Sequence, residues 1–199
     1  MTRDDHLKPL SVYRLLPSLG DFRTLLMGPS LRKIIRWQIS GSPADLPTAL
    51  TAEWDGNPQL RATEFPSGYP EAPVLSRRIA DAMREELLAA GRLIPVHIEG
   101  ADAGAYLCYA VEAVVDCVDV ARSSRPKRTT GEIKKTVFRA DALPADLPAF
   151  RVPQFPGGVY WNGWAVDRLW DFLGADLEAR LVWSEDAART PHPNPWGLA

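Results

Sequence analysis

Residues 75–115 read LSRRIADAMREELLAAGRLIPVHIEGADAGAYLCYAVEAVV, and their pattern is the most informative in the chain about its fold. Its first part has apolar residues at helical spacing, namely Leu75, Ile79, Met83 and Leu87. This spacing predicts an amphipathic helix over residues 75–90. Ser76 can cap the start of the helix by accepting a main-chain N–H, and Gly91 can end it.

The second part of the same stretch predicts two paired strands. Residues 93–99 end in an alternation of apolar and polar side chains, which is typical of a half-buried strand. A Gly-rich turn at residues 100–104 leads into a second strand-like run at residues 105–115. Pro95 cannot donate a ladder hydrogen bond, so the first strand is expected near a sheet edge.

Outward from this stretch, the remaining elements complete an α+β pattern. A second amphipathic helix is predicted at residues 164–173, ended by Gly174. Residues 31–39 favour a strand by their β-branched and aromatic side chains, although they could equally open a helix. Further short strands are predicted at residues 11–15, 60–65, 132–139, 149–152, 159–161 and 180–183, with a reversal at Asp55-Gly56. The prediction is an α+β fold, mostly antiparallel sheet with two principal amphipathic helices.

The predicted organisation has three parts. Residues 1–70 form a strand and loop region that belongs to the same domain, and residues 71–184 form the α+β core. Residues 185–199 contain the Pro-rich run TPHPNPWGLA, which is expected to be extended and loosely held.

Composition excludes several classes of protein. The chain has 199 residues with 23 Lys+Arg against 25 Asp+Glu, a balance that argues against a dedicated nucleic-acid binder. It has no apolar run long enough to span a membrane and no basic stretch followed by an apolar one at its start, so we expect a soluble, cytoplasmic protein. Two cysteines, Cys108 and Cys117, are too few for a disulfide scaffold or a four-ligand zinc site.

No catalytic constellation emerges from the residue pattern, and we expect no cofactor. The histidines His6, His97 and His192 are far apart in the sequence, and no base is placed to activate either cysteine. His97 is expected to be a half-buried structural residue. Asp116 and Asp119, three positions apart, could hold a metal ion, but Asx-type turns that accept main-chain N–H groups are the favoured interpretation, with Ser123 or Ser124 acting similarly.

Charge and tryptophan are unevenly distributed along the chain. Basic side chains gather between residues 122 and 139, and carboxylates dominate from Asp141 onward. The basic stretch is either a solvated face or a surface that steers a charged protein partner. The chain has seven tryptophans. The interpretation as core is favoured for Trp161 and Trp170, while Trp54, Trp164 and Trp196 are equally suited to core and recognition.

The order of these elements resembles a bacterial immunity-protein family of polymorphic toxin systems, number eleven in the immunity-protein series. The resemblance covers residues 70–175 and rests on Val74, Leu75 and Ser76, on Tyr106 or Tyr109 with Val115, Asp116, Cys117, Asp119 and Ser123, and on Phe150, Arg151, Val159 and Tyr160. The chain departs from the family pattern at Trp161-Asn162, where a small polar pair is usual. The resemblance implies a cytoplasmic, non-catalytic antitoxin that binds and blocks its cognate toxin.

The leading hypothesis is therefore an immunity protein that contacts a protein toxin. The expected contact residues are Asp116, Asp119, Arg122, Arg125, Arg128, Tyr160 and Trp164. A first alternative is a small-molecule or carbohydrate-binding module that uses exposed tryptophans as a stacking platform. A weaker alternative is a hydrolase built from Asp116, Asp119 and His97, which requires His97 to lie within hydrogen-bond reach of either carboxylate.

Overall fold

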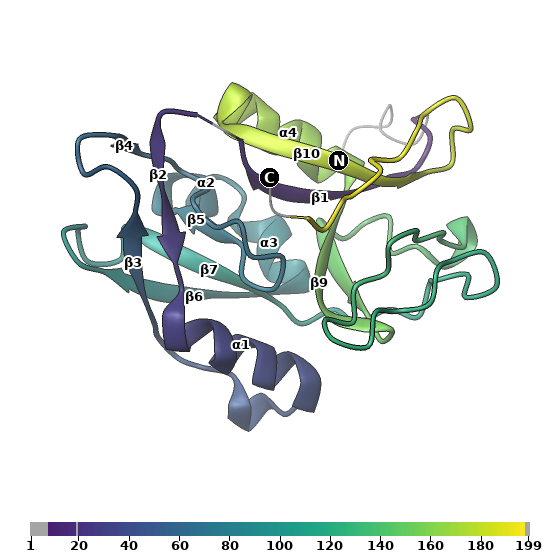
Figure 1. Cartoon of the computed structure of the whole chain (residues 1–199), viewed down its shortest axis with the longest axis horizontal. Coiled ribbons are helices and arrows are strands. Elements are labelled where there is room, and N and C mark those ends of the chain that lie inside the picture. Colours follow the sequence, from purple (N-terminus) through teal and green to yellow (C-terminus); the bar gives the residue numbers. More distant parts are fainter. Residues whose placement is uncertain (1–7, 19, 198–199) are drawn as a thin grey trace.

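The strands of this computed structural model form two sheets over the residues that it describes, 8–18 and 20–197 (Figure 1). His6 lies outside this range. The first sheet has the spatial order β10 (Leu177–Ser184), β1 (Ser11–Pro17), β9 (Phe155–Asn162) and β8 (Ala149–Val152). Each neighbouring pair in it is antiparallel. The earliest strand of the chain thus lies between two of the latest.

The second sheet is mixed and is built from the N-terminal half of the chain. Its spatial order is β4 (Arg61–Ala62), β2 (Phe22–Leu26), β3 (Leu50–Asp55), β6 (Gly91–Ile98), β7 (Tyr106–Val111) and β5 (Val74–Ser76). The β2–β4 and β3–β6 pairs are parallel, and the other pairs are antiparallel. The predicted pairing of the strands on either side of the turn at 100–104 is confirmed.

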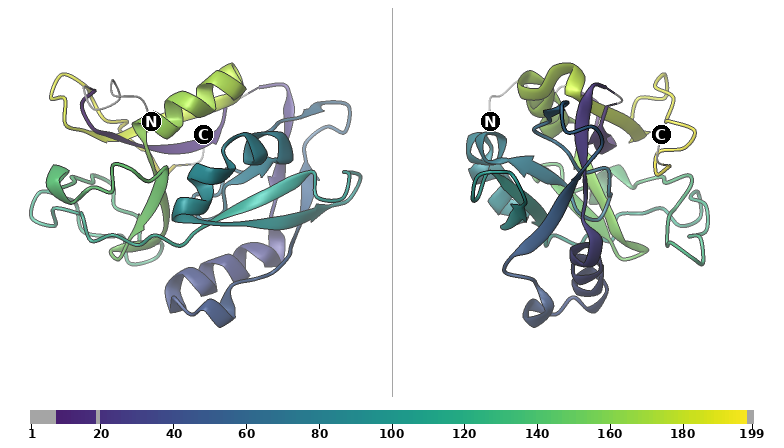
Figure 2. Two further views of the ribbon diagram at one scale, coloured as in Figure 1. Left: turned by 180° about the vertical axis from the view of Figure 1, so that it is seen from behind. Right: turned by 60° about the vertical axis from the view of Figure 1, so that its left-hand side comes forward.

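Three helices pack on the second sheet: α1 (Gly28–Ser40) on one face, and α2 (Arg77–Ala82) and α3 (Arg84–Ala90) on the other. The fourth, α4 (Gly163–Leu173), packs on β1, β9 and β10 of the first sheet, and short 3-10 helices lie at Pro43–Asp45, Ala140–Ala142 and Gly174–Asp176. Figure 2 shows α1 well separated from α2 and α3. The α+β fold class with mostly antiparallel pairing is confirmed. In the described part of the chain, no helix is both long and apolar enough to cross a bilayer.

Of the two alternatives left open for residues 31–39, the helix is present and the strand is not, because these residues lie in α1. Pro29 stands in the first turn, where its fixed φ suits a helix, and Gly41 ends the helix with a φ of 65°. Ile34 and Trp37 are buried one turn apart, whereas Arg32 and Lys33 are exposed. The amphipathic spacing outweighs the strand propensity of the isoleucines and the tryptophan.

The helix predicted at 75–90 is present in modified form. Leu75 belongs to the short strand β5, and Ser76 is the N-cap, whose Oγ accepts the main-chain N–H of Ile79 at 3.3 Å. The helix is broken at Met83, between α2 and α3. Gly91 is the first residue of β6, and a Cβ there would lie 2.2 Å from the Ala110 carbonyl oxygen.

The main core lies between the two sheets and α2, α3 and α4. It contains alternate residues of the first sheet, such as Tyr13, Leu15, Val159 and Trp161, which pack against Leu87 and other residues of the helices. The buried position predicted for Trp161 is confirmed. A second cluster, centred on Trp37, joins α1 to the opposite face of the second sheet. Residues before position 70 contribute strands to both sheets, β1 to the first and β2, β3 and β4 to the second.

The second face of the first sheet has its own core. Val12, Tyr160 and Val182 point to this face and pack against Cys117, Phe138 and other residues of the long connection between β7 and β8. The strand predicted at 132–139 is wrong, since only an isolated bridge joins Val118 to Phe138 there. Side-chain packing, side-chain hydrogen bonds and scattered main-chain hydrogen bonds order this connection instead, and one of the last joins the Asp119 N–H to the Val137 carbonyl at 2.8 Å.

The tail was expected to be loosely held, and this is wrong for residues 192–197. Trp196 is only 4% exposed and belongs to the core on the second face of the first sheet. The reversal at Asp55-Gly56 leads into a strand near residue 60, as predicted: β3 ends at Asp55 and the chain continues into β4. This strand is shorter than expected, and it pairs with β2 and not with β3.

Candidate partner-binding surface

The chain between β7 and β8, residues 112–148, is called here the connecting segment. It contains isolated bridges and a 3-10 turn but no strand of either sheet. Segments of this length without regular structure are uncommon in compact domains and usually carry function. This one is anchored by buried side chains, among them Cys117, Ile133, Phe138 and Leu143. It therefore presents its polar side chains from a packed base, on the right of Figure 1.

Asp119 organises the start of this surface. Its Oδ1 accepts the main-chain N–H groups of Ala121 at 3.1 Å and Arg122 at 3.2 Å. The Ser123 hydroxyl accepts the N–H of Val137 at 2.9 Å, and the Ser124 hydroxyl accepts that of Lys135 at 3.1 Å. These bonds confirm the expected Asx-type turn and tie residues 119–124 to residues 135–137. Asp119 positions the loop, and its carboxylate is half-buried.

Asp116 is exposed and also takes part in local hydrogen bonds. Its Oδ1 accepts from Gln154 Nε2 at 2.8 Å, and its main-chain carbonyl accepts from the Arg139 guanidinium. The residues described contain no group of three or more His, Cys, Asp or Glu side chains arranged to hold a metal ion. Asp116 therefore joins β8 and β9 to the connecting segment at its exposed rim.

Residues 122–139 form what we call the basic loop. Its exposed cations are Arg122, Arg125, Lys127, Arg128, Lys134, Lys135 and Arg139. Lys127 pairs with Glu132 at 2.5 Å. Within the described residues, no ion pair involves Arg122, Arg125 or Arg128. These guanidinium groups remain available to an acidic partner.

Two valines next to the basic loop are unusually exposed. Val114 is 50% exposed and Val120 is 68% exposed. Residues 111–120 read VEAVVDCVDV, in which apolar and acidic residues are mixed. Cys117 and Val118 of this stretch are buried, whereas Val114 and Val120 on either side of them are exposed, so the sequence itself contains a sign of the two exposed valines. Exposed apolar side chains beside arginines are typical of protein-binding surfaces.

Tyr160 must be removed from the predicted contact residues. Its side chain is 0% exposed, stacks on Phe150 with ring centroids 5.7 Å apart, and meets Phe138 edge-on. Burial raises the pKa of its hydroxyl well above the ordinary value. Trp164 is half-buried, and its Nε1 donates to the Ala145 carbonyl at 2.9 Å. Trp164 therefore anchors the end of the connecting segment to α4.

Comparisons with known proteins add no family assignment. No family model matches the chain, and no curated protein is similar to it. The resemblance to the immunity-protein family stays a prediction. Among the residues that carry it, Ser76 caps α2, Cys117 is buried, and Asp119 and Ser123 shape the basic loop.

The structure does not bring the proposed hydrolase residues together. His97 is exposed on β6, in the second sheet, and lines an open depression of about 440 Å³ with Glu53, Glu99 and Asp102. Asp116 and Asp119 bond to Gln154 and to the turn at residues 121–122 instead. No hydrogen bond joins His97 to either aspartate over the described ranges. His97 is also more exposed than expected.

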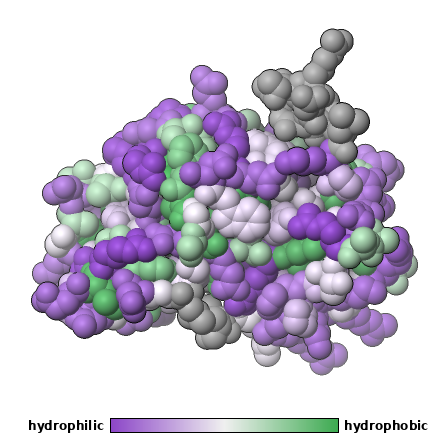
Figure 3. All heavy atoms as spheres, turned by 90° about the horizontal axis from the view of Figure 1, so that it is seen from above, coloured by the Kyte–Doolittle hydropathy of each residue, from purple (hydrophilic) through white to green (hydrophobic). Residues whose placement is uncertain are grey.

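The stacking platform required for a carbohydrate module is not formed either. Trp170 was expected in the core but is 38% exposed on α4, and its ring meets Tyr13 edge-on at 71°. Trp196 is buried, and Trp54 is half-buried against Tyr106 at 80°. No coplanar pair of exposed rings occurs in the part of the chain that the structure describes. Figure 3 shows narrow hydrophobic strips among hydrophilic atoms on the face seen from above.

Proposed function

We propose that the chain is a non-catalytic immunity protein that binds and neutralises a cognate bacterial toxin, in the cytoplasm of the cell that makes both. The observation that carries this proposal is the basic loop, an ordered and irregular segment with unpaired arginines on a packed base. The resemblance to immunity family eleven supports the same function. Arg122, Arg125 and Arg128 are the expected points of contact, with Asp116 at the rim.

The preformed shape of the basic loop favours a protein partner. Asp119, Ser123 and Ser124 hold the loop through hydrogen bonds, so little conformational entropy remains to be lost on binding. Guanidinium groups form bidentate bonds with carboxylates, and unpaired arginines are frequent anchors of interfaces. We therefore expect the toxin to present an acidic face.

The overall charge argues against nucleic acid as the partner. The chain carries a formal net charge of −2, whereas binding to a polyanion depends on summed attraction from many cations. A local cationic patch on an otherwise acidic protein is better suited to a patch of opposite charge on another protein. A stable complex needs about 800 Å² from each partner, so contacts beyond the arginines are required, with Val114 and Val120 the nearest apolar candidates.

Co-expression with the product of the neighbouring gene tests the proposal. Host survival and co-purification are scored for the wild-type chain and for the double variant Arg125→Glu, Arg128→Glu. We expect the wild-type chain to rescue the host and to form a stable complex with the neighbouring product. Both the rescue and the complex should be weaker with the double variant. A toxic neighbour that is neither neutralised nor bound would contradict the function, and full rescue by the double variant would contradict the basic loop as the contact surface.

A further inference from the structure

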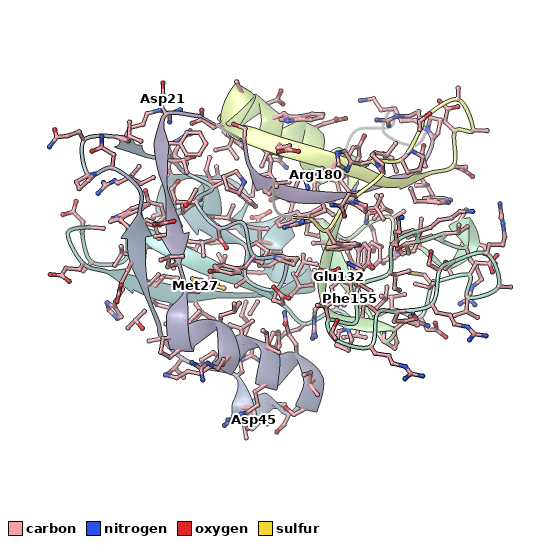
Figure 4. The ribbon with its side chains drawn as sticks, viewed as in Figure 1. Asp21, Met27, Asp45, Glu132, Phe155 and Arg180 are labelled. Atoms are coloured by element: carbon pink, nitrogen blue, oxygen red, sulfur yellow. The ribbon has the colours of Figure 1, made fainter. Side chains whose placement is uncertain are left out.

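The C-terminal segment, defined as residues 192–197, lies against the first sheet like a bound peptide. After β10 ends at Ser184, the linker of residues 185–191 runs largely exposed. The chain then returns, and the main-chain N–H of His192 donates to the Leu181 carbonyl of β10 at 2.8 Å. From there it crosses the second face of the sheet, where Figure 4 labels Arg180, Glu132 and Phe155.

Two buried arginines recognise this segment through its main chain. Arg14 Nη1 donates to the carbonyls of Pro195 at 3.0 Å and Gly197 at 3.1 Å. Arg180 Nη1 donates to the carbonyls of Asn194 at 3.3 Å and Gly197 at 2.5 Å. Residues 193–197 bend and turn, so the two arginines hold the carbonyls of a folded segment. Recognition of main-chain carbonyls, combined with a pocket for one side chain, is how many domains bind peptides.

The side-chain pocket in this groove holds the indole of Trp196. The ring meets Phe155 edge-on, with centroids 4.9 Å apart, and Tyr160 at 5.0 Å. The Arg14 guanidinium lies 5.7 Å from the ring centroid. A Cβ at Gly158 would come within 3.1 Å of the indole, so a glycine there keeps the pocket open. An aromatic anchor in a pocket is the usual source of specificity in such sites.

The groove contains buried polar atoms without a hydrogen-bond partner, namely Trp196 Nε1, Tyr160 Oη and Arg14 Nε. Four such atoms lie elsewhere in the described residues, in Arg23, Gln38, Trp54 and Gln154, but three gather here around one segment. Alongside the segment, a cavity of about 310 Å³ is lined by Lys127, Glu132 and Lys134 of the basic loop. Buried polar atoms are rarely left unpaired in a protein interior, so these atoms indicate a site that can accommodate more than one arrangement of its occupant.

We propose that this groove is a peptide-binding site for turn-forming segments of the Pro-Trp-Gly type, which residues 192–197 occupy in cis. A peptide of the same chemistry can replace them. The groove uses Arg14 and Arg180 for the carbonyls and Phe155 and Tyr160 for the tryptophan. This inference goes beyond the proposed function and does not depend on it.

The test severs the full-length chain without removing any part of it. A protease site is inserted between Ala187 and Ala188, both exposed in the linker, and the folded protein is cut. A fluorescein-labelled peptide with the sequence of residues 189–199 is then added, and its anisotropy is measured. The cut protein should bind the peptide at least about ten-fold more tightly than the uncut protein, in which the tethered segment competes at a high effective concentration.

Competition by unlabelled peptides defines the specificity. A peptide carrying Trp196→Ala should compete at least about ten-fold more weakly than the native sequence, because the aromatic anchor is lost. The matched control carries Asn194→Ala, which keeps the carbonyl used by Arg180, and should compete within about three-fold of the native peptide. Equal competition by the two variant peptides would overturn the proposal.

A second variant covers the case in which the cut protein loses its fold. Trp196→Ala in the intact chain vacates the indole pocket without cutting the linker, and its fold is checked by circular dichroism. This variant should bind the labelled native peptide in trans, whereas the wild-type chain should not. A folded variant that fails to bind would contradict the proposal.

Discussion

Arg14 and Arg180 lie directly opposite each other on the antiparallel strands β1 and β10, and both donate to the carbonyl oxygen of Gly197. Like charges at paired positions of a sheet normally repel. Here burial and the neighbouring Arg180 lower the pKa of Arg14 from 12.5 to about 10. Glu178 accepts from Arg180 Nε at 2.6 Å, and the carboxylates of Glu71, Glu132 and Glu178 partly offset the lowering of the Arg14 pKa. Both arginines also donate to carbonyls of the C-terminal segment.

Arg14→Lys should destabilise the protein although the charge is kept. The Arg14 fork also donates to the Gly68 carbonyl at 2.7 Å, and an ammonium group cannot reach all of these carbonyls at once. We expect a loss of about 1–3 kcal/mol in the free energy of unfolding, measured by urea denaturation. The control is Arg77→Lys, at an exposed arginine that donates to the Gly104 carbonyl, which should change stability by less than about 0.5 kcal/mol. Equal effects of the two substitutions would contradict a special role for Arg14.

Charge reversal in the basic loop should slow association with the toxin. Arg125→Glu with Arg128→Glu should lower the association rate about ten-fold at low ionic strength and weaken its dependence on salt, because electrostatic steering acts mainly on encounter. Stopped-flow mixing at several salt concentrations measures both effects. The same charge change at Arg32 and Arg36, exposed on α1, is the matched control. If the control slows association equally, the effect comes from net charge and not from the loop.

Removing the Asp119 carboxylate should loosen the basic loop locally. Asp119→Ala leaves the Ala121 N–H without its acceptor, removes one of the two acceptors of the Arg122 N–H, and should cost about 1 kcal/mol. Hydrogen exchange of these amides should become faster, while that of the Val111 amide in β7 should not change. Asp119→Asn keeps an acceptor oxygen at the same position and should restore most of the protection. Unchanged exchange in Asp119→Ala would show that the turn does not depend on this side chain.

The stability of the fold should decrease as pH rises through the alkaline range, because the thiol of Cys108 is buried. Burial raises the pKa of this thiol from 9.0 to about 12. The stability that the raised thiol pKa contributes is fully present below the unfolded-state pKa. It is lost as pH rises from about 9 to about 12, because only the unfolded chain releases the thiol proton in that window. Between about pH 8 and about pH 10, the wild type should lose about 1.4 kcal/mol more stability than Cys108→Ala. Denaturation curves at both pH values measure the difference, and parallel losses would contradict it.

Local patterns in the sequence were sufficient to predict much of the fold. The apolar spacing of Leu75, Ile79, Met83 and Leu87, the cap at Ser76 and the paired strands on either side of the 100–104 turn all depend on neighbours in sequence. The same holds for α4 and for the Asx-type turn at Asp119. At residues 31–39, strand propensity and helical amphipathicity compete within one segment, and burial of Ile34 and Trp37 decides for the helix.

Features that depend on distant residues could not be predicted in this way. The Pro-rich composition of residues 190–199 indicated a loose tail, because nothing nearby reveals that Arg14, Phe155 and Arg180 form a groove for it. Tyr160 and Trp164 are close in sequence, yet the first faces the covered side of the first sheet and the second lies on a helix. The basic loop was recognisable from composition, whereas its ordered shape was not.

The position of β1 between β9 and β10 also sets the order in which the protein can be completed during synthesis. The second sheet uses residues up to 111 and can pair as soon as these have emerged, but β1 must wait for partners that begin at residues 155 and 177. At synthesis rates of about 5–20 residues per second this delay is on the order of 10 seconds. The base under the basic loop includes residues of β1, β9 and β10, so a nascent chain cannot display that loop in its final form. Only a finished molecule can present the basic loop to a partner.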